Sequence, residues 1–214
     1  NYHGLSSEIV TPLEGIVKQI SKGTMVRYKM GVGINDQQTN RIEWSASLAG
    51  NSDATIAIRG ISALIEGEEG AAISSDANGD RFEIDLPKSQ IDYIKTLRDK
   101  AGSKPIILVV NSGSALNLTE VEPYVDAILY AWYLGEQGGN AIADIIFGNS
   151  NPSGKLPITI PKSLSHLPPY DNYNMENRTY KFTNHQPMYP FGFGLSYSIF
   201  SYSDLSIKKD KINI

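Results

Sequence analysis

The sequence predicts an α/β domain, a layered α/β sandwich around a mostly parallel (mixed) sheet, and three observations support this prediction. Short apolar segments alternate with amphipathic helical segments through most of the chain. One of these segments, 105–110, is almost continuously apolar, as expected for a strand that is covered on both faces. With 214 residues, of which 41% are hydrophobic and 20% charged, the composition is that of a globular chain with a sizeable core.

The first predicted helix begins at Pro12. Thr11 is a suitable N-cap, Pro12 suits the first helical position, and Glu14 completes a capping box with Thr11. Apolar residues then recur at helical spacing, at positions Leu13, Ile16, Val17 and Ile20. Gly23 ends this helix.

The other elements follow from the period of the apolar residues and from the positions of Gly and Pro. Strands are expected at 25–30, 54–61, 105–110, 125–132 and 156–160, and helices at 42–48, 88–101 and 138–147. A long loop rich in Gly and Glu, 62–87, separates the second strand from the second of these helices.

The composition of the sequence changes near Pro161. Pro, Tyr and Asn dominate from there, and no helical period is visible. The last segment, 200–214, alternates and becomes rich in Lys, which is compatible with an edge strand, a linker or the opening of another domain.

Charge and composition argue against several classes of partner. The net charge is −4 with no basic face, which disfavours nucleic acid and anionic membranes. The longest apolar runs are far too short to span a bilayer. No signal peptide is visible at the start, and this leaves export open. Without cysteines, disulfides and thiolate metal sites are excluded.

Neither a metal nor a cofactor is expected. His3, His166 and His185 are far apart and show no ligand spacing. The glycine-rich segment 135–140 could cradle an anion at a helix start, but it lacks the G-x-G-x-x-G spacing of dinucleotide-binding turns. A tight strand-to-helix connection explains its glycines equally well.

The densest candidate for chemistry is the acidic cluster of Glu66, Glu68 and Glu69. It follows a predicted buried strand, where α/β folds place their functional loops. Carboxylates this close repel one another, and a proton donor to a glycosidic oxygen needs a carboxyl group with a raised pKa. The alternative is a solvated acidic loop.

A second candidate is the pair Asp80 and Arg81. Neighbouring carboxylate and guanidinium groups can bind sugar hydroxyls, and they can equally form an ion pair that fixes a loop.

Taken together, an ordered series of motifs resembles the C-terminal α/β sandwich domain of family 3 glycoside hydrolases. The motifs are 1–4 (NYHG), 10–16 (VTPLEGI), 65–69 (IEGEE), 79–81 (GDR), 85–87 (DLP), 131–144 (AWYLGEQGGNAIAD), 147–157 (FGNSNPSGKLP) and 189–197 (YPFGFGLSY). Each motif is modest evidence, whereas the ordered set is highly specific and covers nearly the whole chain.

The resemblance implies a retaining exo-β-glycosidase of the β-xylosidase or β-glucosidase type, which acts on terminal non-reducing β-linked sugars. It implies that a preceding barrel domain carries the nucleophilic Asp and that a Glu of the loop 62–87 is the general acid/base. By this alignment Glu68 is the acid/base, with Glu66 and Glu69 as alternatives. Asp80 and Arg81, which lie in the family motif 79–81, are the candidates for substrate binding.

The resemblance also implies the domain organisation. Residues 1–198 correspond to the α/β sandwich without its usual first strand, and residues 199–214 to a linker or the first strand of a fibronectin-III-like domain. The expected partners are a β-linked oligosaccharide and the barrel domain, and the expected location is periplasmic or secreted. The rival hypothesis from a different class is a non-catalytic module that positions sugar or scaffolds the barrel. A third, weaker hypothesis is a nucleotide-binding domain, and the absence of a G-x-G-x-x-G motif or a P-loop counts against it.

Overall fold

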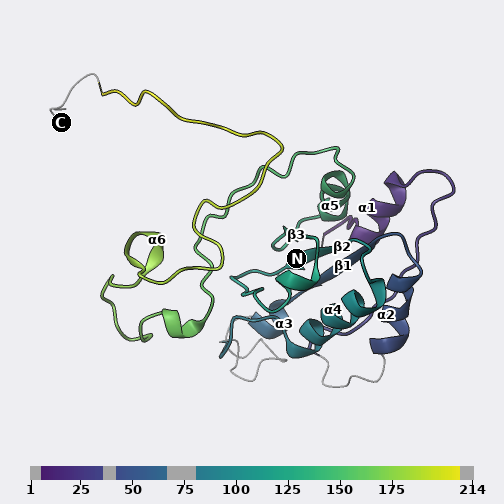
Figure 1. The fold of residues 1–214 in the computed structure, drawn as a ribbon, viewed down its shortest axis with the longest axis horizontal. Helices are drawn as coiled ribbons and strands as arrows, with labels where there is room; N and C mark the ends of the chain where they lie inside the picture. Colours follow the sequence, from purple (N-terminus) through teal and green to yellow (C-terminus); the bar gives the residue numbers. More distant parts are fainter. Residues whose placement is uncertain (1–5, 36–41, 67–80, 208–214) are drawn as a thin grey trace.

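A parallel β-sheet forms the centre of the computed structural model, which describes residues 6–35, 42–66 and 81–207 (Figure 1). Its strands are β1 (Thr55–Gly60), β2 (Ile106–Asn111) and β3 (Ala127–Tyr130), in the order β1-β2-β3. Thr55 pairs with Ile106 at one end of the first ladder, and both ladders in the described part are parallel. The predicted α/β class is therefore confirmed.

Helices cover both faces of the sheet (Figure 1). The helices α2 (Ile42–Gly50) and α4 (Lys88–Ala101) pack on one another and over one face, whereas α1 (Pro12–Gln19) and α5 (Gly138–Ile146) form a pair over the other. Ile106, Leu108 and Val110 share a core cluster with α4, and Val109, equally buried, lies outside that cluster. Successive strand residues point to opposite faces, so β2 contributes to both halves of the core.

The helix α1 begins as its local sequence predicts. The Thr11 hydroxyl accepts from the Glu14 N–H at 3.2 Å, and the Glu14 carboxylate accepts from the Thr11 N–H at 2.7 Å. These two bonds satisfy backbone groups that the first turn leaves without helical partners. The helix then packs against α5 so closely that a Cβ on Gly15 would collide with the carbonyl of Gly139.

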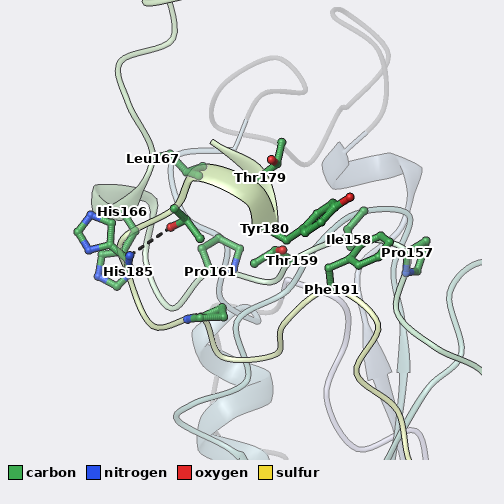
Figure 2. A pocket seen from close by; sticks show the side chains of 12 residues that line it. Pro157, Ile158, Thr159, Pro161, His166, Leu167, Thr179, Tyr180, His185 and Phe191 are labelled. Atoms are coloured by element: carbon green, nitrogen blue, oxygen red, sulfur yellow. Dashed lines mark hydrogen bonds between the residues drawn. The ribbon is translucent and has the colours of Figure 1, made fainter. Parts of the chain in front are cut away.

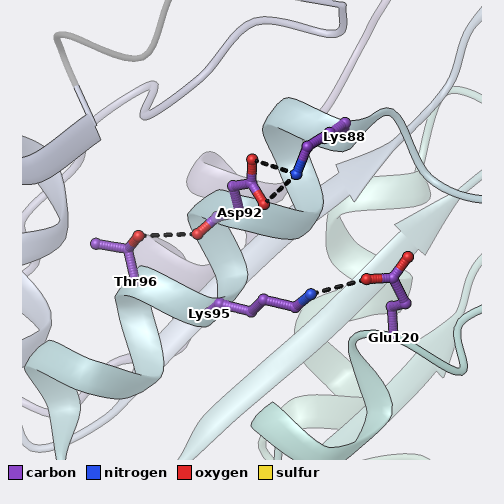
Figure 3. Close-up of polar contacts among 5 residues, drawn as sticks. All are labelled: Lys88, Asp92, Lys95, Thr96 and Glu120. Carbon is purple, nitrogen blue, oxygen red and sulfur yellow. Dashed lines mark hydrogen bonds and ion pairs between the residues drawn. The ribbon is translucent and has the colours of Figure 1, made fainter.

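The helix α4 has the predicted bounds, 88–101. Its inner side carries the buried residues Ile91, Ile94 and Leu97 of the predicted amphipathic face. Its outer side carries ion pairs, from Lys88 to Asp92 at 2.9 Å and from Lys95 to Glu120 at 2.8 Å (Figure 3). Exposed pairs of this kind contribute little to stability, so the apolar face fixes the position of α4.

The shorter helical elements lie in the connections and in the C-terminal part: α3 (Ala63–Glu66), η1 (Glu122–Tyr124), η2 (Leu164–His166) and α6 (Thr179–Phe182). Of these, α3 follows β1 directly, inside the segment predicted as a loop.

Two predicted strands are wrong. Residues 25–30 are exposed and pair with no strand of the described part. The Arg59 side chain instead donates to the carbonyls of Met30 at 3.3 Å and Val32 at 3.1 Å. Alternation of apolar and polar residues therefore shows only that a segment is suited to a strand. A strand forms only where a neighbouring backbone also pairs with its N–H and C=O groups.

Residues 156–160 form no strand either. Pro157 and Pro161 provide no N–H, and proline within a sheet is confined to edges and strand ends. Ile160 forms an isolated antiparallel bridge with Tyr189, and Leu156 donates to the Phe193 carbonyl at 2.8 Å. This segment therefore pairs with a later loop and does not extend the sheet.

The C-terminal part runs away from the sheet (Figure 1). From Gly148 onward the described chain holds two short helical turns, η2 and α6, and residues 198–207 have neither helix nor strand. The predicted segment 200–214 is thus irregular as far as residue 207, and its remainder lies outside the described residues.

Candidate functional site

The carboxyl ends of the three parallel strands meet at one edge of the sheet, and polar side chains follow each of them. Glu66 ends α3, directly after β1; Gly113 and Ser114 follow β2; and Tyr133 follows β3. Ligand and active sites of open α/β sheets occur at this edge. The parallel order of the strands therefore gathers residues that are up to 67 positions apart in the sequence.

Glu66 is the centre of this group. Its Oε1 accepts from the Gly113 N–H at 2.5 Å and from the Tyr133 hydroxyl, and its Oε2 accepts from the Ser114 hydroxyl. Three donors from two different connections thus point at one carboxylate. Through these bonds Glu66 joins the connection after β1 to the connections after β2 and β3.

The absence of a side chain at Gly113 leaves room for this arrangement. A Cβ at this position would lie 2.7 Å from Glu66 Oε1 and 2.7 Å from the Tyr133 ring. Both distances are too short for a carbon atom, so any other residue would push the carboxylate or the ring away.

Arg81 follows residues 67–80, here called the acidic segment, and its side chain reaches the turn after β2 that carries Ser114. Its Nη2 donates to the Ser114 hydroxyl at 2.9 Å and to the Ala115 carbonyl at 2.8 Å. Burial lowers the pKa of Arg81, an effect that the nearby Glu66 charge opposes. Its Nη1 is buried and has no partner among the described residues.

Two tyrosines of the β3 connection are held neutral. Burial, opposed by a backbone hydrogen bond, raises the pKa of Tyr130 to about 12. Burial and then the bond to Glu66 raise the pKa of Tyr133 well above its ordinary value. Between them Trp132 has a left-handed backbone, with φ of 56°. A bulky residue rarely adopts this conformation, so the connection is strained where it turns Tyr133 toward Glu66.

The structure brings Glu66 and Arg81 together through Ser114. Glu68, Glu69 and Asp80 lie outside the described residues. Sequence reasoning missed Ser114 and Tyr133, although both follow a predicted strand at its carboxyl end and that signal was available. The glycine-rich segment 135–140 leads from β3 into α5, which begins at Gly138. The Gly139 N–H donates to the Val10 carbonyl at 3.0 Å.

A separate pocket of about 340 Å³ lies in the C-terminal part (Figure 2). Its wall includes Pro157, Pro161, Tyr180 and Phe191, and the rings of Tyr180 and Phe191 stack at 4.4 Å. None of the residues that line it is a hydrogen-bond partner of Glu66 or Arg81. The polar groups of the candidate site and this apolar pocket are therefore distinct features.

Within the described ranges, no group of three or more His, Cys, Asp or Glu side chains is arranged to hold a metal ion. No helix in those ranges is both long enough and apolar enough to cross a membrane.

Comparison with known proteins adds a consistent set of relatives. Residues 1–197 match the glycosyl hydrolase family 3 C-terminal domain. The chain is 34% identical to a periplasmic beta-glucosidase of Salmonella typhimurium, over 95% of this chain and 29% of that protein. It is 43% identical to a xylan 1,4-beta-xylosidase of Xylanibacter ruminicola, over 70% of this chain and 17% of that protein.

Solved structures agree with these relatives. A GH3 exo-beta-xylosidase in complex with a xylobiose aziridine probe superposes with a TM-score of 0.79 at 28% identity, over 93% of this chain and 26% of that one. A β-glucosidase from Erythrobacter marinus gives 0.72 at 30% identity, over 92% and 29%. The chain thus spans less than a third of the length of each of these relatives.

Proposed function

Because the chain belongs to glycosyl hydrolase family 3, as its C-terminal domain, we propose that it is the acid/base-bearing domain of a retaining exo-β-glycosidase. The enzyme, of the β-xylosidase or β-glucosidase type, removes terminal non-reducing β-linked sugars. The observation that carries the proposal is the polar cluster around Glu66, at the carboxyl edge of the sheet and next to the acidic segment.

In the proposed reaction one carboxyl group is the nucleophile and a second is the general acid/base. An Asp of the barrel domain attacks the anomeric carbon while Glu68 gives its proton to the departing glycosidic oxygen. A glycosyl-enzyme ester remains. Glu68, now a carboxylate, takes a proton from water, and the water oxygen attacks the anomeric carbon and releases the sugar with retained configuration.

The contacts of Glu66 favour Glu68 over Glu66 as the acid. An acid catalyst must turn a proton-bearing oxygen toward the substrate, and three protein donors already point at the two oxygens of Glu66. Glu69 stays the third candidate, since its position in the sequence alone supports it.

Arg81 and Asp80 are proposed to bind the substrate. In support of this role, Arg81 Nη1 has no partner among the described residues, so the guanidinium group keeps an unused donor. Its Nη2 is already engaged by the turn after β2, so the guanidinium group is oriented before any sugar arrives.

The proposed partners rest on the resemblance to the family, and the relatives, of which this chain spans less than a third, are long enough to hold further domains. Residues 1–198 form the α/β domain, residues 199–214 a linker or the first strand of a fibronectin-III-like domain, and a barrel domain supplies the nucleophile. Ile199, Leu205 and Ile207 are exposed, which fits a segment that another domain covers. One relative is named as periplasmic, which supports a periplasmic or secreted location.

The test is Glu68→Ala in the complete enzyme. General acid catalysis contributes about 10²–10⁴-fold, so the variant should lose about this factor on glycosides with poor leaving groups and far less on activated aryl glycosides. Azide should restore turnover and give a glycosyl azide. It needs no general base to attack the anomeric carbon of the glycosyl-enzyme ester and displace the Asp carboxylate.

Glu66→Ala and Glu69→Ala are the controls for this assignment. If one of them, and not Glu68→Ala, shows azide rescue, that residue is the acid/base. If none does, the domain is the non-catalytic, scaffolding module. As a second arm, the isolated chain should hydrolyse neither aryl β-xyloside nor aryl β-glucoside, and turnover close to that of a complete enzyme would contradict the two-domain mechanism.

A further inference from the structure

One hydroxyl group lies between the two ends of the acidic segment. Glu66 is the last described residue before positions 67–80, and Arg81 is the first described residue after them. The Ser114 hydroxyl donates to Glu66 Oε2 and accepts from Arg81 Nη2 at 2.9 Å. The chain therefore leaves from this turn and returns to it.

The turn that carries this hydroxyl is firmly held. The Ser114 carbonyl accepts from the Ser112 hydroxyl at 2.6 Å and from the Tyr130 hydroxyl at 2.9 Å. Ser112 is fully buried and follows β2, whose residues Val109 and Val110 are also fully buried. A turn that is tied to the central strand has little freedom to move, because its displacement would disturb the core.

The charges of Glu66 and Arg81, and the space left by Gly113, are compatible with these contacts of Ser114. The Glu66 carboxylate and the Arg81 guanidinium group balance one another across the Ser114 hydroxyl, so neither charge is left uncompensated in a partly buried place. Gly113 leaves room for the carboxylate, and the Tyr133 hydroxyl donates to it from the opposite connection.

We propose that Glu66, Ser114 and Tyr133 are positioning residues that clamp the start of the acidic segment for acid catalysis, with Arg81 clamping its end. This inference rests on the proposed function of Glu68. Glu68 follows Glu66 by two residues, and two residues of chain span at most about 7 Å. Because a misplacement of about 1 Å can cost about 10²-fold in rate, an anchor this near to the acid controls its efficiency.

A merely structural hydrogen bond would have different consequences, and the chain offers a matched example. The Tyr189 hydroxyl donates to Glu122 Oε1 at 3.0 Å, and burial followed by this bond raises the pKa of Tyr189, as at Tyr133. Tyr189 lies in the C-terminal part and is not a hydrogen-bond partner of Glu66 or Arg81. Tyr189→Phe therefore removes a tyrosine–carboxylate bond of the same chemistry away from the clamp.

The experiment compares Ser114→Ala, Tyr133→Phe and Tyr189→Phe in the complete enzyme. Each variant is assayed with a xyloside or glucoside that has a poor leaving group and with an activated aryl glycoside. Ser114→Ala and Tyr133→Phe should lower kcat about 10- to 10²-fold on the first substrate and much less on the second. Ser114→Thr, which keeps the hydroxyl, should restore most of the loss. Tyr189→Phe should change both rates equally or not at all.

The melting temperature of each variant shows whether it has folded, and Tyr133→Phe is the milder change if Ser114→Ala does not fold. Equal effects of Tyr133→Phe and Tyr189→Phe on the leaving-group dependence would overturn the clamp. Azide rescue of Glu66→Gln would also overturn it, because Glu66 would then be the acid itself. Glu68→Ala reports separately on the proposed function, so failure of the acid assignment and failure of the clamp give different patterns.

Discussion

The layered part of the molecule and its C-terminal part use similar apolar residues with opposite results. In β2, Ile106, Leu108, Val109 and Val110 are all 0% exposed. In the C-terminal part, Tyr170, Ile199 and Leu205 are each 97% exposed. Hydrophobicity alone therefore does not decide burial. The central strand β2 has backbone partners on both sides and helices over both faces of the sheet, whereas residues 198–207 have neither helix nor strand.

The C-terminal part is attached at a few points. The Tyr189 hydroxyl reaches Glu122 at 3.0 Å, and the Asn117 side chain donates to the Lys162 carbonyl at 2.9 Å. Beyond these contacts its rings mostly contact one another, as Tyr189 and Phe193 do at 5.1 Å. The comparison teaches that the sheet supplies the frame of the candidate site, and that the last described residues, 198–207, lie outside this frame.

The largest expected effect on stability is that of a substitution in the central strand of the sheet. Leu108→Ala removes a side chain that is fully buried in the middle of the central strand. We expect the free energy of unfolding to fall by about 2–5 kcal/mol, because the lost contacts leave a cavity between the sheet and α4. Chemical denaturation measures this loss. A value below about 1 kcal/mol would show that the core around β2 repacks easily and would weaken the contrast.

A smaller effect is expected at the amino edge of the sheet and only in acid. Asp126 accepts from the Ile106 N–H at 2.7 Å and from Arg98 at 2.5 Å, and the backbone bond, followed by that from Arg98, lowers the pKa of Asp126. A lowered pKa in the folded state stabilises the fold above the unfolded pKa, about 3.9, and this contribution disappears as pH falls through the folded value.

Replacing Asp126 by Asn tests this assignment. The variant should lose stability near neutral pH and should show a flatter decline below pH of about 4 than the parent protein, as measured by thermal unfolding at several pH values. If the stability of both proteins fell equally with decreasing pH, Asp126 would not be a source of the acid sensitivity.

The smallest effect is expected for the matched leucine of the C-terminal part. Leu205 is almost fully exposed, so Leu205→Ala should change the free energy of unfolding of this chain by no more than about 0.5 kcal/mol. The same denaturation experiment compares it with Leu108→Ala. A loss near that of Leu108→Ala would mean that Leu205 is buried in solution and that the two regions do not differ as described.

The sequence determined the elements whose signals are local. The capping box of Thr11 and Glu14 fixed the start of α1, because both partners lie within one turn. The period of apolar residues likewise predicted α4 with its bounds and predicted that β1, β2 and β3 exist. The sequence analysis named Glu68 as the first candidate, with Glu66 and Glu69 as alternatives and with Asp80 and Arg81 as a second group. Of these residues, Glu66 and Arg81 lie in the described part of the chain.

Only the tertiary structure decided which of these signals took effect. Residues 25–30 alternate like a strand and remain unpaired, because pairing depends on a neighbouring backbone that local sequence does not reveal. Glu66 meets Ser114 and Tyr133 across 48 and 67 positions, because parallel strands end at one edge of a sheet. Contacts over such distances follow from the order of the strands, which no local period in the sequence encodes.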